Sequence, residues 1–399
     1  INRKVCFVRG AMVGESVEVE ATPQKNKNFY VGDLLKIIKS SPARMKSPCA
    51  SSGQCQGCQL LHVSYEQQLK HKKELIKESL NKYTGIDLSY VKFHDVIGLN
   101  QREHFLMNAD LPVVEFKGKI TFGIYQRESK YLTIMTHCMK HHPLIEQTLC
   151  DLENILNEYE CRSYNDKFKK GLRFLKIRVL QNHVQLVFIT GKDGLKEEVI
   201  QAIHSLKQVN GLFMSINTSK YQDFEQQGYK KVFGNMKNEF IYDNHKYLVS
   251  IKSHMPHNLE AYQIINKVIK IMVKDSQKII SLNSQLGILE LSLDQEVIAI
   301  DDKQEHIDDA KYNARVLQKN NVHFICGNIE KKVIPYAKKK EYDTFIIQND
   351  KNGIPDGLKD TLRLGKVETI VYVNHSPSTM AKDIQDLSKY YRVVEIKPV

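Results

Sequence analysis

The sequence predicts a multidomain protein of mixed α/β and α+β class, and three observations support this. At 399 residues the chain is too long for one ordinary hydrophobic core, so we expect two or three domains. Short strands fill the first 40 residues, strands and helices mix without strict order over 85–250, and regular βα alternation begins near residue 258. The predicted domains are 1–45, 46–250 and 251–399.

The first domain is predicted to be a small β-barrel. Its strands are indicated by residues 4–10, 15–24 and 28–39. Small barrels commonly bind nucleic acid through basic strands that carry aromatic residues. A solvated hairpin tip would have the same composition. The candidate contacts are Lys25, Lys27, Phe29 and Tyr30.

Three cysteines lie in one loop rich in glycine, serine and glutamine, with the spacing Cys49-x5-Cys55-x2-Cys58. A Cys-x2-Cys pair lets two thiolates converge on one centre, and three thiolates leave a tetrahedral zinc site or an iron–sulfur cluster one ligand short. We prefer Cys138 as the fourth ligand because it lies on a loop, whereas two later cysteines fall in or beside apolar helical stretches. Spacing alone leaves zinc and iron–sulfur open.

The middle domain is predicted to be α+β. A helix is expected over 64–83, with a capping box formed by Ser64 and Gln67. Two hairpins are expected further along the chain, with turns near 181–183 and at Asp243-Asn244.

From about residue 258 the pattern predicts a doubly wound, mostly parallel sheet. Asp301 ends the second strand roughly 20 residues after the tip of the first, where an acid would bind a ribose hydroxyl. The first βα turn is a poor phosphate cradle, because Gly287 is its only glycine. The expected strands are 278–283, 296–300, 322–326, 343–348, 367–373 and 391–396.

A histidine lies at one of these strand tips. Residues 371–383 predict a buried strand, a turn at Asn374-His375, and an amphipathic helix opened by Ser378 and Thr379. Open α/β sheets place their chemistry at the carboxyl ends of strands, so His375 is a candidate catalytic residue.

The charge of the chain is uneven. Its net charge is +12, but residues 251–399 hold 22 Lys and Arg against 20 Asp and Glu, so most of the excess lies before residue 251. A polyanion contacted by the first 250 residues would explain this, although basic proteins without such a partner exist. No apolar run reaches the roughly 18 residues of a membrane span, and no secretory signal opens the chain. We expect a cytoplasmic or organelle-matrix protein without a membrane partner.

Taken together, these features resemble the 23S rRNA (uracil-5-)-methyltransferases, the RumA/TrmA-like family of RNA m5U methyltransferases. Residues 7–20, FVRGAMVGESVEVE, look like the signature of its TRAM domain. Residues 49–72 resemble its Cys-x5-Cys-Gly-Gly-Cys-Gln-Leu-Gln-His-Leu-x-Tyr stretch, and 123–143 resemble its Gly-Phe-Tyr-Arg…Cys-Pro-Leu segment. The match runs along almost the whole chain.

The resemblance implies three parts: an N-terminal TRAM or OB-like β-barrel, an α+β middle domain with an iron–sulfur cluster loop, and a C-terminal Rossmann-like domain that binds S-adenosylmethionine (SAM). It favours a [4Fe–4S] cluster over zinc. The chain starts at Ile1 without Met and stops before the family's closing strands and catalytic glutamate, so we expect its first and last domains to be incomplete. The implied cluster ligands are Cys49, Cys55, Cys58 and Cys138.

The SAM motifs depart from the family pattern. Residues 281–287 align with Asp-Leu-x-Cys-Gly-x-Gly but lack its acid and first glycine. Gln348 replaces the aspartate that contacts the base, and Pro256 replaces a glutamine in the Ser-Phe-Phe-Gln-x-Asn motif. The implied SAM-site positions are Asn258, Gly287, Asp301 and Gln348.

The nucleophile motif departs too. The family's Ser-Cys-Asn-Pro-x-Thr-x-Ala-Arg-Asp is NHSPSTMAKD here, with His375 in the place of the cysteine. In the family this thiolate adds to C6 of uracil, and a base later removes the C5 proton. Imidazole is a poor nucleophile and leaving group for this step. Four positions are kept: Pro377, Thr379, Ala381 and Asp383.

The leading interpretation is a monomeric, RNA-binding iron–sulfur member of this family with an eroded methyl-transfer site. Such a pseudoenzyme would act on rRNA, in its modification or in ribosome assembly. The alternative is an active SAM-dependent RNA uracil-C5 methyltransferase. A third, weaker interpretation is a redox sensor that uses the cluster.

Overall fold

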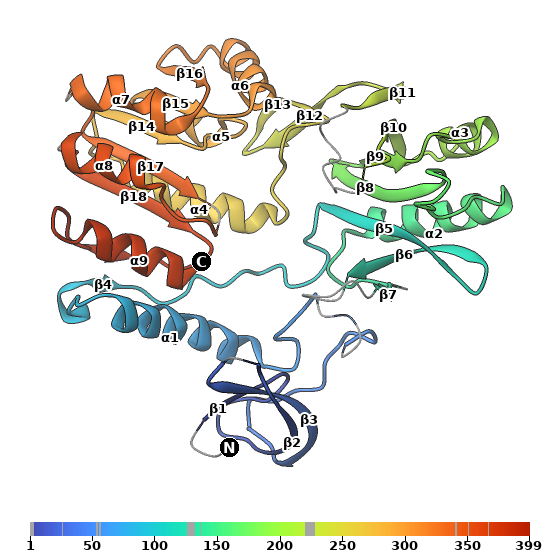
Figure 1. The fold of residues 1–399 in the computed structure, drawn as a ribbon. Coiled ribbons are helices and arrows are strands. Elements are labelled where there is room, and N and C mark those ends of the chain that lie inside the picture. Colours follow the sequence, from blue (N-terminus) through green and yellow to red (C-terminus); the bar gives the residue numbers. More distant parts are fainter. Residues whose placement is uncertain are drawn as a thin grey trace. The chain divides into compact units, whose positions relative to one another are not determined.

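The structure is a computed structural model of residues 1–399, and it describes all of them except 1–3, 26, 53, 54, 56, 126–131, 136, 220–227, 340, 350 and 366. The chain divides into two compact units, whose elements are labelled in Figure 1. The first unit is Ile1–Lys72 with Gly123–Cys138, and the second is Lys73–Phe122 with Met139–Val399. The division into three domains stays a prediction.

The first unit contains a three-stranded sheet of order β1-β3-β2. β1 is parallel to β3, and β2 is antiparallel to it. Exposed and half-buried residues alternate along β2, as in a strand with one packed face. The three predicted strands are therefore confirmed, whereas their closure into a barrel stays a prediction. Their bounds are β1 (Val5–Val8), β2 (Ser16–Pro23) and β3 (Phe29–Lys39).

An ion pair ties the start of β2 to the segment before the cysteine loop. Arg44 Nε lies 2.5 Å from Glu15 Oε1, and the backbone N–H groups of Met12 and Ser41 donate to the same carboxylate. The hydrogen bond from Arg44 is the main cause that lowers the pKa of Glu15 to about 2. Glu15 therefore stays ionised and fixes this corner of the unit.

Helix α1 (Tyr65–Tyr83) confirms the predicted helix. The side chain that reaches back at its start is Gln68, one residue beyond the predicted Gln67. Its Nε2 donates to the carbonyls of Leu60 and Val63. This is not a helix cap, and the predicted capping box is wrong in one of its bonds, because Ser64 N donates to Ala43 O at 2.9 Å and not to Gln67.

The second unit begins with a mixed sheet in which β11, β10, β9, β8, β5 and the start of β6 follow one another. Both predicted hairpin turns are confirmed. Gln181 has a φ of +55° between β8 and β9, and Asp243 and Asn244 have φ of +48° and +61° between β12 and β13. The strands are β5 (Asn108–Phe116), β6 (Lys119–Tyr125), β8 (Leu172–Leu180), β9 (His183–Thr190), β10 (Val209–Ile216), β11 (Lys230–Gly234), β12 (Lys237–Tyr242) and β13 (His245–Ser250); the helices are α2 (Pro143–Glu158) and α3 (Glu197–His204).

A five-stranded parallel sheet of order β16-β15-β14-β17-β18 follows, as predicted. The chain leaves the central strand β14 toward β16 and returns on its other side to β17 and β18, so the strand order reverses between β14 and β17. The strands are β14 (Lys278–Leu282), β15 (Glu296–Asp301), β16 (Val322–Cys326), β17 (Thr344–Asn349) and β18 (Thr369–Asn374).

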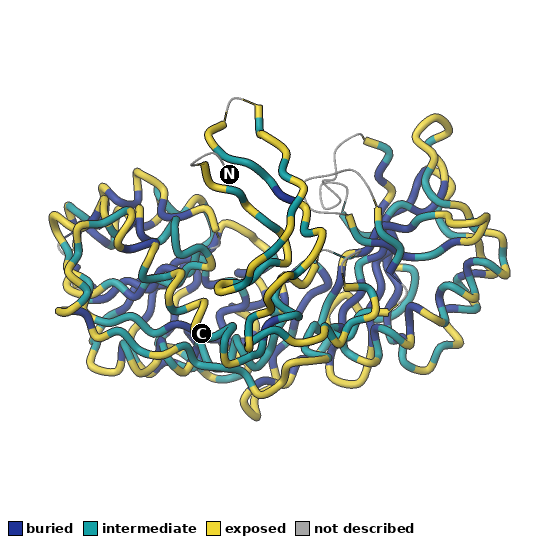
Figure 2. Tube along the Cα trace, turned by 90° about the horizontal axis from the view of Figure 1, so that it is seen from below, coloured by how far each residue is buried: buried dark blue, intermediate teal, exposed yellow. Residues whose placement is uncertain are grey.

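Helices cover both faces of this sheet. Ile279 packs with residues of α4 and α6, whereas its neighbour Ile280 packs with residues of α7 and α8 on the opposite face. The strands are accordingly among the most buried parts of the unit (Figure 2). None of the helices among the described residues has both the length and the apolar character of a membrane span. The helices are α4 (Leu259–Met272), α5 (Ile288–Leu291), α6 (Gln304–Val316), α7 (Ile329–Lys339), α8 (Asp356–Gly365) and α9 (Pro377–Leu387).

The sixth predicted strand, 391–396, was wrong as a member of this sheet. Only Glu395–Ile396 form a strand, β19, and it pairs in parallel with β4 (Lys92–Phe93). The Glu395 carboxylate lies 2.6 Å from His94 Nε2 and 3.3 Å from the ammonium of Lys397. The pairing with β4 in place of β18 could not be read from the local pattern of residues 391–396.

Candidate functional site

The carboxyl ends of four parallel strands bring the nucleophile position and the predicted SAM-site positions other than Asn258 to one edge of the sheet. Asp301, Asn349 and Asn374 are the last residues of β15, β17 and β18, and Asn283 follows β14. Asn283 Nδ2 donates to Asn349 Oδ1 over 2.7 Å, across the point where the strand order reverses. Ligands of open α/β sheets bind at this point, so the amide pair marks the centre of the candidate site.

Asp301 anchors the loop after β14 to β15. Its Oδ2 accepts from the backbone N–H of Gln285 at 2.8 Å, and its Oδ1 accepts from Lys303 N at 2.9 Å and lies 3.0 Å from His306 Nδ1. Burial opposes ionisation, but these hydrogen bonds outweigh it and hold the pKa of Asp301 below its usual value. The carboxylate predicted to bind a ribose is therefore an anion that also fixes the loop.

The loop after β14 is a tight turn. Asn283, Gln285 and Gly287 have φ of +61°, +50° and +70°. Only glycine suits the last position, because a Cβ there would lie 2.6 Å from the ring of Phe324. Gly287 thus serves the packing of the loop against β16, and its predicted SAM contact stays a prediction.

The two other SAM-site positions have defined places. Asn258 caps α4, and its side-chain oxygen accepts from Ala261 N at 3.0 Å. Gln348 is half-buried near the end of β17 and pairs in register with Val373 of β18. Their contacts with SAM stay predictions.

His375 is exposed between β18 and α9. The helix begins two residues earlier than predicted: Ser376 is its N-cap, with Oγ accepting from Thr379 N, and Pro377 occupies its first turn. Asn374 Oδ1 accepts from Ser376 N at 2.6 Å and shapes the turn. The backbone around the nucleophile position is therefore held by side chains on both sides of His375.

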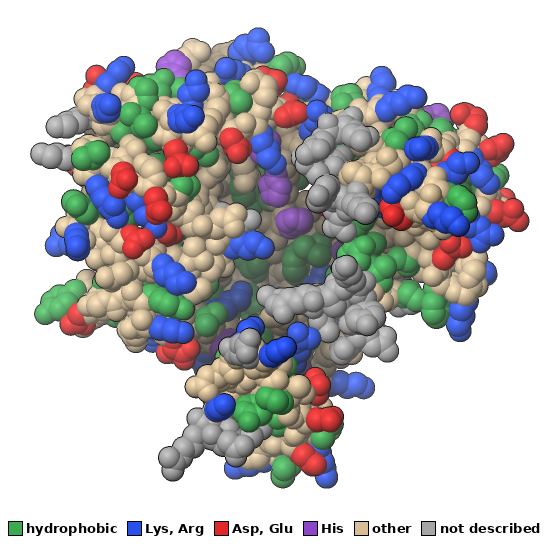
Figure 3. Space-filling view, viewed as in Figure 1, with side chains coloured by type: hydrophobic (Ala, Val, Ile, Leu, Met, Phe, Trp, Pro, Cys, Tyr) green, Lys and Arg blue, Asp and Glu red, His purple; other side chains and the backbone are tan. Residues whose placement is uncertain are grey.

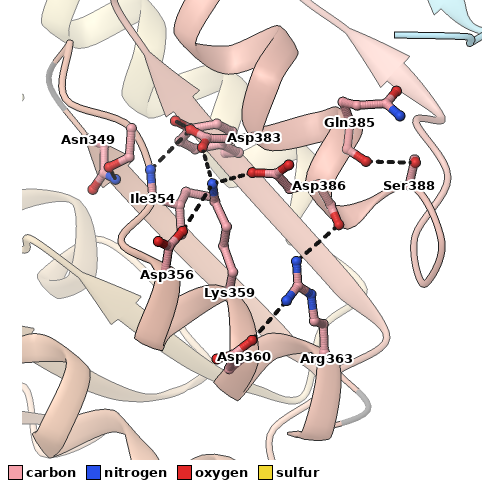
Figure 4. Close-up of polar contacts among 12 residues, drawn as sticks. Asn349, Ile354, Asp356, Lys359, Asp360, Arg363, Asp383, Gln385, Asp386 and Ser388 are labelled. Carbon is pink, nitrogen blue, oxygen red and sulfur yellow. Dashed lines mark hydrogen bonds and ion pairs between the residues drawn. The ribbon is translucent and has the colours of Figure 1, made fainter.

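A buried ion pair joins α8 to α9, the helix that follows this turn (Figure 4). Asp383, on α9, lies 2.9 Å from Lys359 Nζ and accepts from the Tyr372 hydroxyl at 2.7 Å and from Ile354 N at 3.0 Å. Lys359 also contacts Asp386 at 2.6 Å. Burial disfavours the ammonium, but the two aspartates outweigh it and raise the pKa of Lys359. Three elements of the site, β18, α9 and the loop after β17, meet at this pair.

Sequence reasoning missed Lys359. A signal was present on α9, where Asp383 and Asp386 are three residues apart and so share one face. Two carboxylates on a face that packs against α8 require a cation from that helix.

The four predicted cluster ligands all belong to the first unit. Cys55 N donates to Ser51 O at 2.9 Å, so a tight turn brings the chain back after Cys49. A Cβ on Gly57 would lie 3.5 Å from Cys55 Sγ and 3.6 Å from Ile124. The loop therefore packs on the end of β6, which from residue 123 pairs with β7 (Leu132–Ile134), the strand that leads to Cys138.

Metal ligation by these cysteines stays a prediction. Within the described ranges, no three side chains of His, Cys, Asp or Glu are grouped so that they could hold a metal ion. Cys58 is exposed, and the other three cysteines are half-buried. Of the two cysteines set aside, Cys150 is exposed on α2 rather than buried in an apolar helix face as expected.

The N-terminal sheet presents aromatic and basic side chains together. Phe7 is 58% exposed and its ring lies 5.2 Å from that of Phe29, edge to face. The ammonium of Lys27 lies 5.3 Å from the Phe29 ring centroid. Sequence reasoning named Lys27 and Phe29 but missed Phe7, because the parallel pairing of β1 with β3 could not be read from local pattern.

Comparison with known proteins identifies the family. No family model matches the chain. An uncharacterized RNA methyltransferase of Streptococcus agalactiae is 28% identical over 408 residues, which cover 100% of this chain and 90% of the relative. One of Halalkalibacterium halodurans is 30% identical over 411 residues, covering 100% and 88%. The chain belongs to this RNA methyltransferase family.

The fold of this RNA methyltransferase family member agrees with a solved structure. The tRNA (uracil-54, C5)-methyltransferase of Pyrococcus abyssi, in complex with S-adenosyl-L-homocysteine, superposes with a TM-score of 0.76 at 20% identity. The match covers 96% of this chain and 89% of that protein. The predicted family and the Rossmann-like methyltransferase fold are thus confirmed.

Proposed function

We propose that this RNA methyltransferase family member binds structured RNA, namely rRNA during modification or ribosome assembly, and has lost efficient uracil-C5 methyl transfer. One observation supports the loss above others. His375 occupies the nucleophile position on a turn whose neighbours Asn374 and Ser376 still hold their hydrogen bonds. These hydrogen bonds fix the turn, but the side chain that it carries is not a thiol.

The chemistry explains why this exchange matters. C5 of uracil attacks a methyl group only after a nucleophile has added to C6, and that nucleophile must later leave. A thiolate does both readily, whereas the imidazole of His375 does neither well. SAM, when bound, would supply the methyl group, and Asp301 with the loop after β14 would hold it. His375 would then act as a hydrogen-bond partner of RNA.

RNA binding is supported by the charge distribution and by the N-terminal sheet. Lys and Arg are interspersed with Asp and Glu over the visible face of α6 to α8 (Figure 3), in line with the near-neutral balance of residues 251–399. The excess positive charge lies earlier in the chain. Phe7, Phe29 and Lys27 offer ring faces and a cation to unpaired bases and phosphates.

Replacing Phe7 with Ala is expected to weaken binding to a single-stranded rRNA fragment by about 1–3 kcal/mol, because a stacked base loses its partner. Lys27→Ala is expected to lower the slope of log affinity against log salt by about 0.7. Fluorescence anisotropy titrations at several salt concentrations measure both. Ile38→Ala removes another exposed apolar side chain, 68% exposed, from the same sheet and is the control. Unchanged affinity in both variants would argue against this surface.

The cysteine set is proposed to hold a [4Fe–4S] cluster. Cys49, Cys55, Cys58 and Cys138 supply four thiolates, the donor set that such clusters prefer, and one compact unit contains all four. Anaerobically purified protein is expected to be brown, with about four irons per chain. The variant Cys138→Ser should lose most of the iron. The variant Cys150→Ser should keep it, because Cys150 is an exposed residue of α2 and is not one of the proposed ligands. Colourless protein that contains zinc would contradict the cluster.

The alternative function, an active SAM-dependent RNA uracil-C5 methyltransferase, is favoured by one observation. Asp383, which is kept from the nucleophile motif, still ties α9 to β18 and to the loop after β17. The scaffold of the site is therefore in place. Transfer of a labelled methyl group from SAM to C5 of uracil by the unmodified protein would establish this alternative and refute the loss proposed above.

A further inference from the structure

A buried carboxyl lies beside the position where the first SAM motif lacks its acid. Ser281, on the central strand β14, stands where the resemblance places that acid. Its hydroxyl donates to Glu290 Oε1 on α5 over 2.6 Å. Both residues are 0% exposed. A carboxyl is thus present within one hydrogen bond of the position that appeared to have lost it.

This carboxyl is only partly satisfied. Among the described residues, no hydrogen-bond partner reaches Glu290 Oε2, although the atom is buried. Natural proteins rarely leave such an oxygen unpaired, and an ionised carboxylate without a cation is costly in an apolar interior. Burial raises the pKa of Glu290 to about 7, against the opposing effect of the Ser281 hydrogen bond.

The titratable groups that face Glu290 bring no positive charge. Tyr262, from α4, is buried and its pKa is raised, first by burial and then by the charge of Glu290. Asp301, from β15, carries a negative charge that raises the pKa of Glu290 further. A cation that binds nearby would therefore favour the ionised form of Glu290.

The place of the pair in the fold indicates where such a cation would come from. Ser281 precedes Asn283 by two residues, so it lies about 7 Å along the strand from the edge where open α/β sheets bind ligands. Glu290 follows the tight turn of residues 283–287 that Asp301 anchors. The carboxyl thus lies directly behind the turn that would hold SAM.

We propose that Glu290 replaces the missing acid of the SAM motif: it holds the turn through Ser281 and ionises when the ammonium or sulfonium of SAM binds on the far side of that turn. Glu290 is a positioning residue and need not touch the ligand. On binding, its proton passes to the buffer. The inference rests on the SAM site of the proposed function, but it requires neither methyl transfer nor RNA.

Calorimetry of SAM binding in two buffers of different ionisation enthalpy tests the proposal. At pH 6 the carboxyl is mostly protonated, so binding should release close to one proton, about 0.9; at pH 7 it is half ionised and about 0.5 should be released, while the ligand's own amino group stays mostly protonated at both pH values. The affinity should accordingly rise about fivefold from pH 6 to pH 7. Proton release with both SAM and S-adenosylhomocysteine would show that the ammonium, which both ligands carry, is the cation that ionises Glu290. Proton release with SAM alone would show that the sulfonium is that cation.

Two variants give the matched comparison. Glu290→Gln keeps the size and the hydrogen bond to Ser281 but cannot ionise, so both the proton release and the pH dependence should disappear. Glu296→Gln removes an exposed carboxyl that pairs with Lys278 at 3.0 Å on the neighbouring strand, and should behave as the unmodified protein does. The double variant Ser281→Asp with Glu290→Ser moves the carboxyl back to β14. It should bind SAM as tightly as the unmodified protein does.

Three results would overturn the proposal: no heat of SAM binding at either pH, binding without proton release at pH 6, or release that persists in Glu290→Gln. Folding is monitored by thermal melts at pH 8, where Glu290→Gln should melt higher because it removes a buried charge. RNA binding by the same preparations, measured at several salt concentrations, separates failure of this inference from failure of the proposed function. Failure of SAM binding with RNA binding intact refutes this inference alone, whereas loss of RNA binding refutes the proposed function.

Discussion

Replacing Lys359 with Met is expected to lower the free energy of unfolding by about 3–5 kcal/mol, the effect of removing one partner from a buried ion pair. The Lys359 side chain is 9% exposed, and that of Asp383 is 6% exposed. Without the ammonium, Asp383 keeps the hydroxyl of Tyr372 and the N–H of Ile354 but faces no compensating charge. Methionine fills a volume similar to that of lysine, so the loss of stability measures the missing charge and not a cavity.

Urea denaturation followed by circular dichroism measures this loss. Lys389→Met, on an exposed lysine after α9, should change stability by less than about 0.5 kcal/mol. Adding Asp383→Asn to Lys359→Met removes the uncompensated charge and should regain part of the stability, because the two side chains are coupled. A loss below about 1 kcal/mol in Lys359→Met would show that solvent already compensates the charge of Asp383.

The variant His375→Cys is expected to form a covalent adduct with RNA that contains 5-fluorouracil, where the unmodified protein forms none. The new thiol would occupy the nucleophile position on a turn fixed by Asn374 and Ser376. Its thiolate can add to C6, and fluorine at C5 cannot leave as a proton, so the adduct persists after methyl transfer. Denaturing gel electrophoresis detects it as a slower band.

A matched control tests whether the adduct depends on the position of the thiol. His323→Cys places a thiol at an exposed position of β16 in the same sheet and should give no adduct. Adduct formation by His375→Cys alone would show that the rest of the site still accepts RNA and a methyl donor. Its absence, with RNA binding intact, would mean that Gln348 and the loop after β14 have also lost their function. An adduct with the unmodified protein would contradict the proposed loss of activity.

The regular part of the fold could be predicted from sequence because its signals are local. Strands such as β14 and β15 are short apolar runs between helical stretches, and their order follows from βα alternation. The segment 391–396 has the same local pattern, yet it pairs with β4, which lies about 300 residues away in the chain. Such pairing depends on distant partners that no local pattern specifies.

The places of the candidate-site residues in the fold could be predicted from the sequence, but the side chains that they contact could not. His375, Asp301 and Asn258 lie at strand or helix ends, as alignment with the family motifs implied. Their hydrogen bonds could not be read from the sequence, because each depends on how the turns close. Glu290 was missed for the same reason: nine residues separate it from Ser281, and only the packing of α5 against β14 brings the two side chains together.

The hydrogen bond between Asn283 and Asn349 joins two amides at the centre of the candidate site. A ligand that binds these amides must break the bond between them, and breaking one such bond costs about 1 kcal/mol. A ligand that offers its own donor and acceptor to the two amides recovers that cost, whereas one that offers none binds about fivefold more weakly. The amide pair would thus select among ligands of similar shape by their polarity, before any chemistry begins.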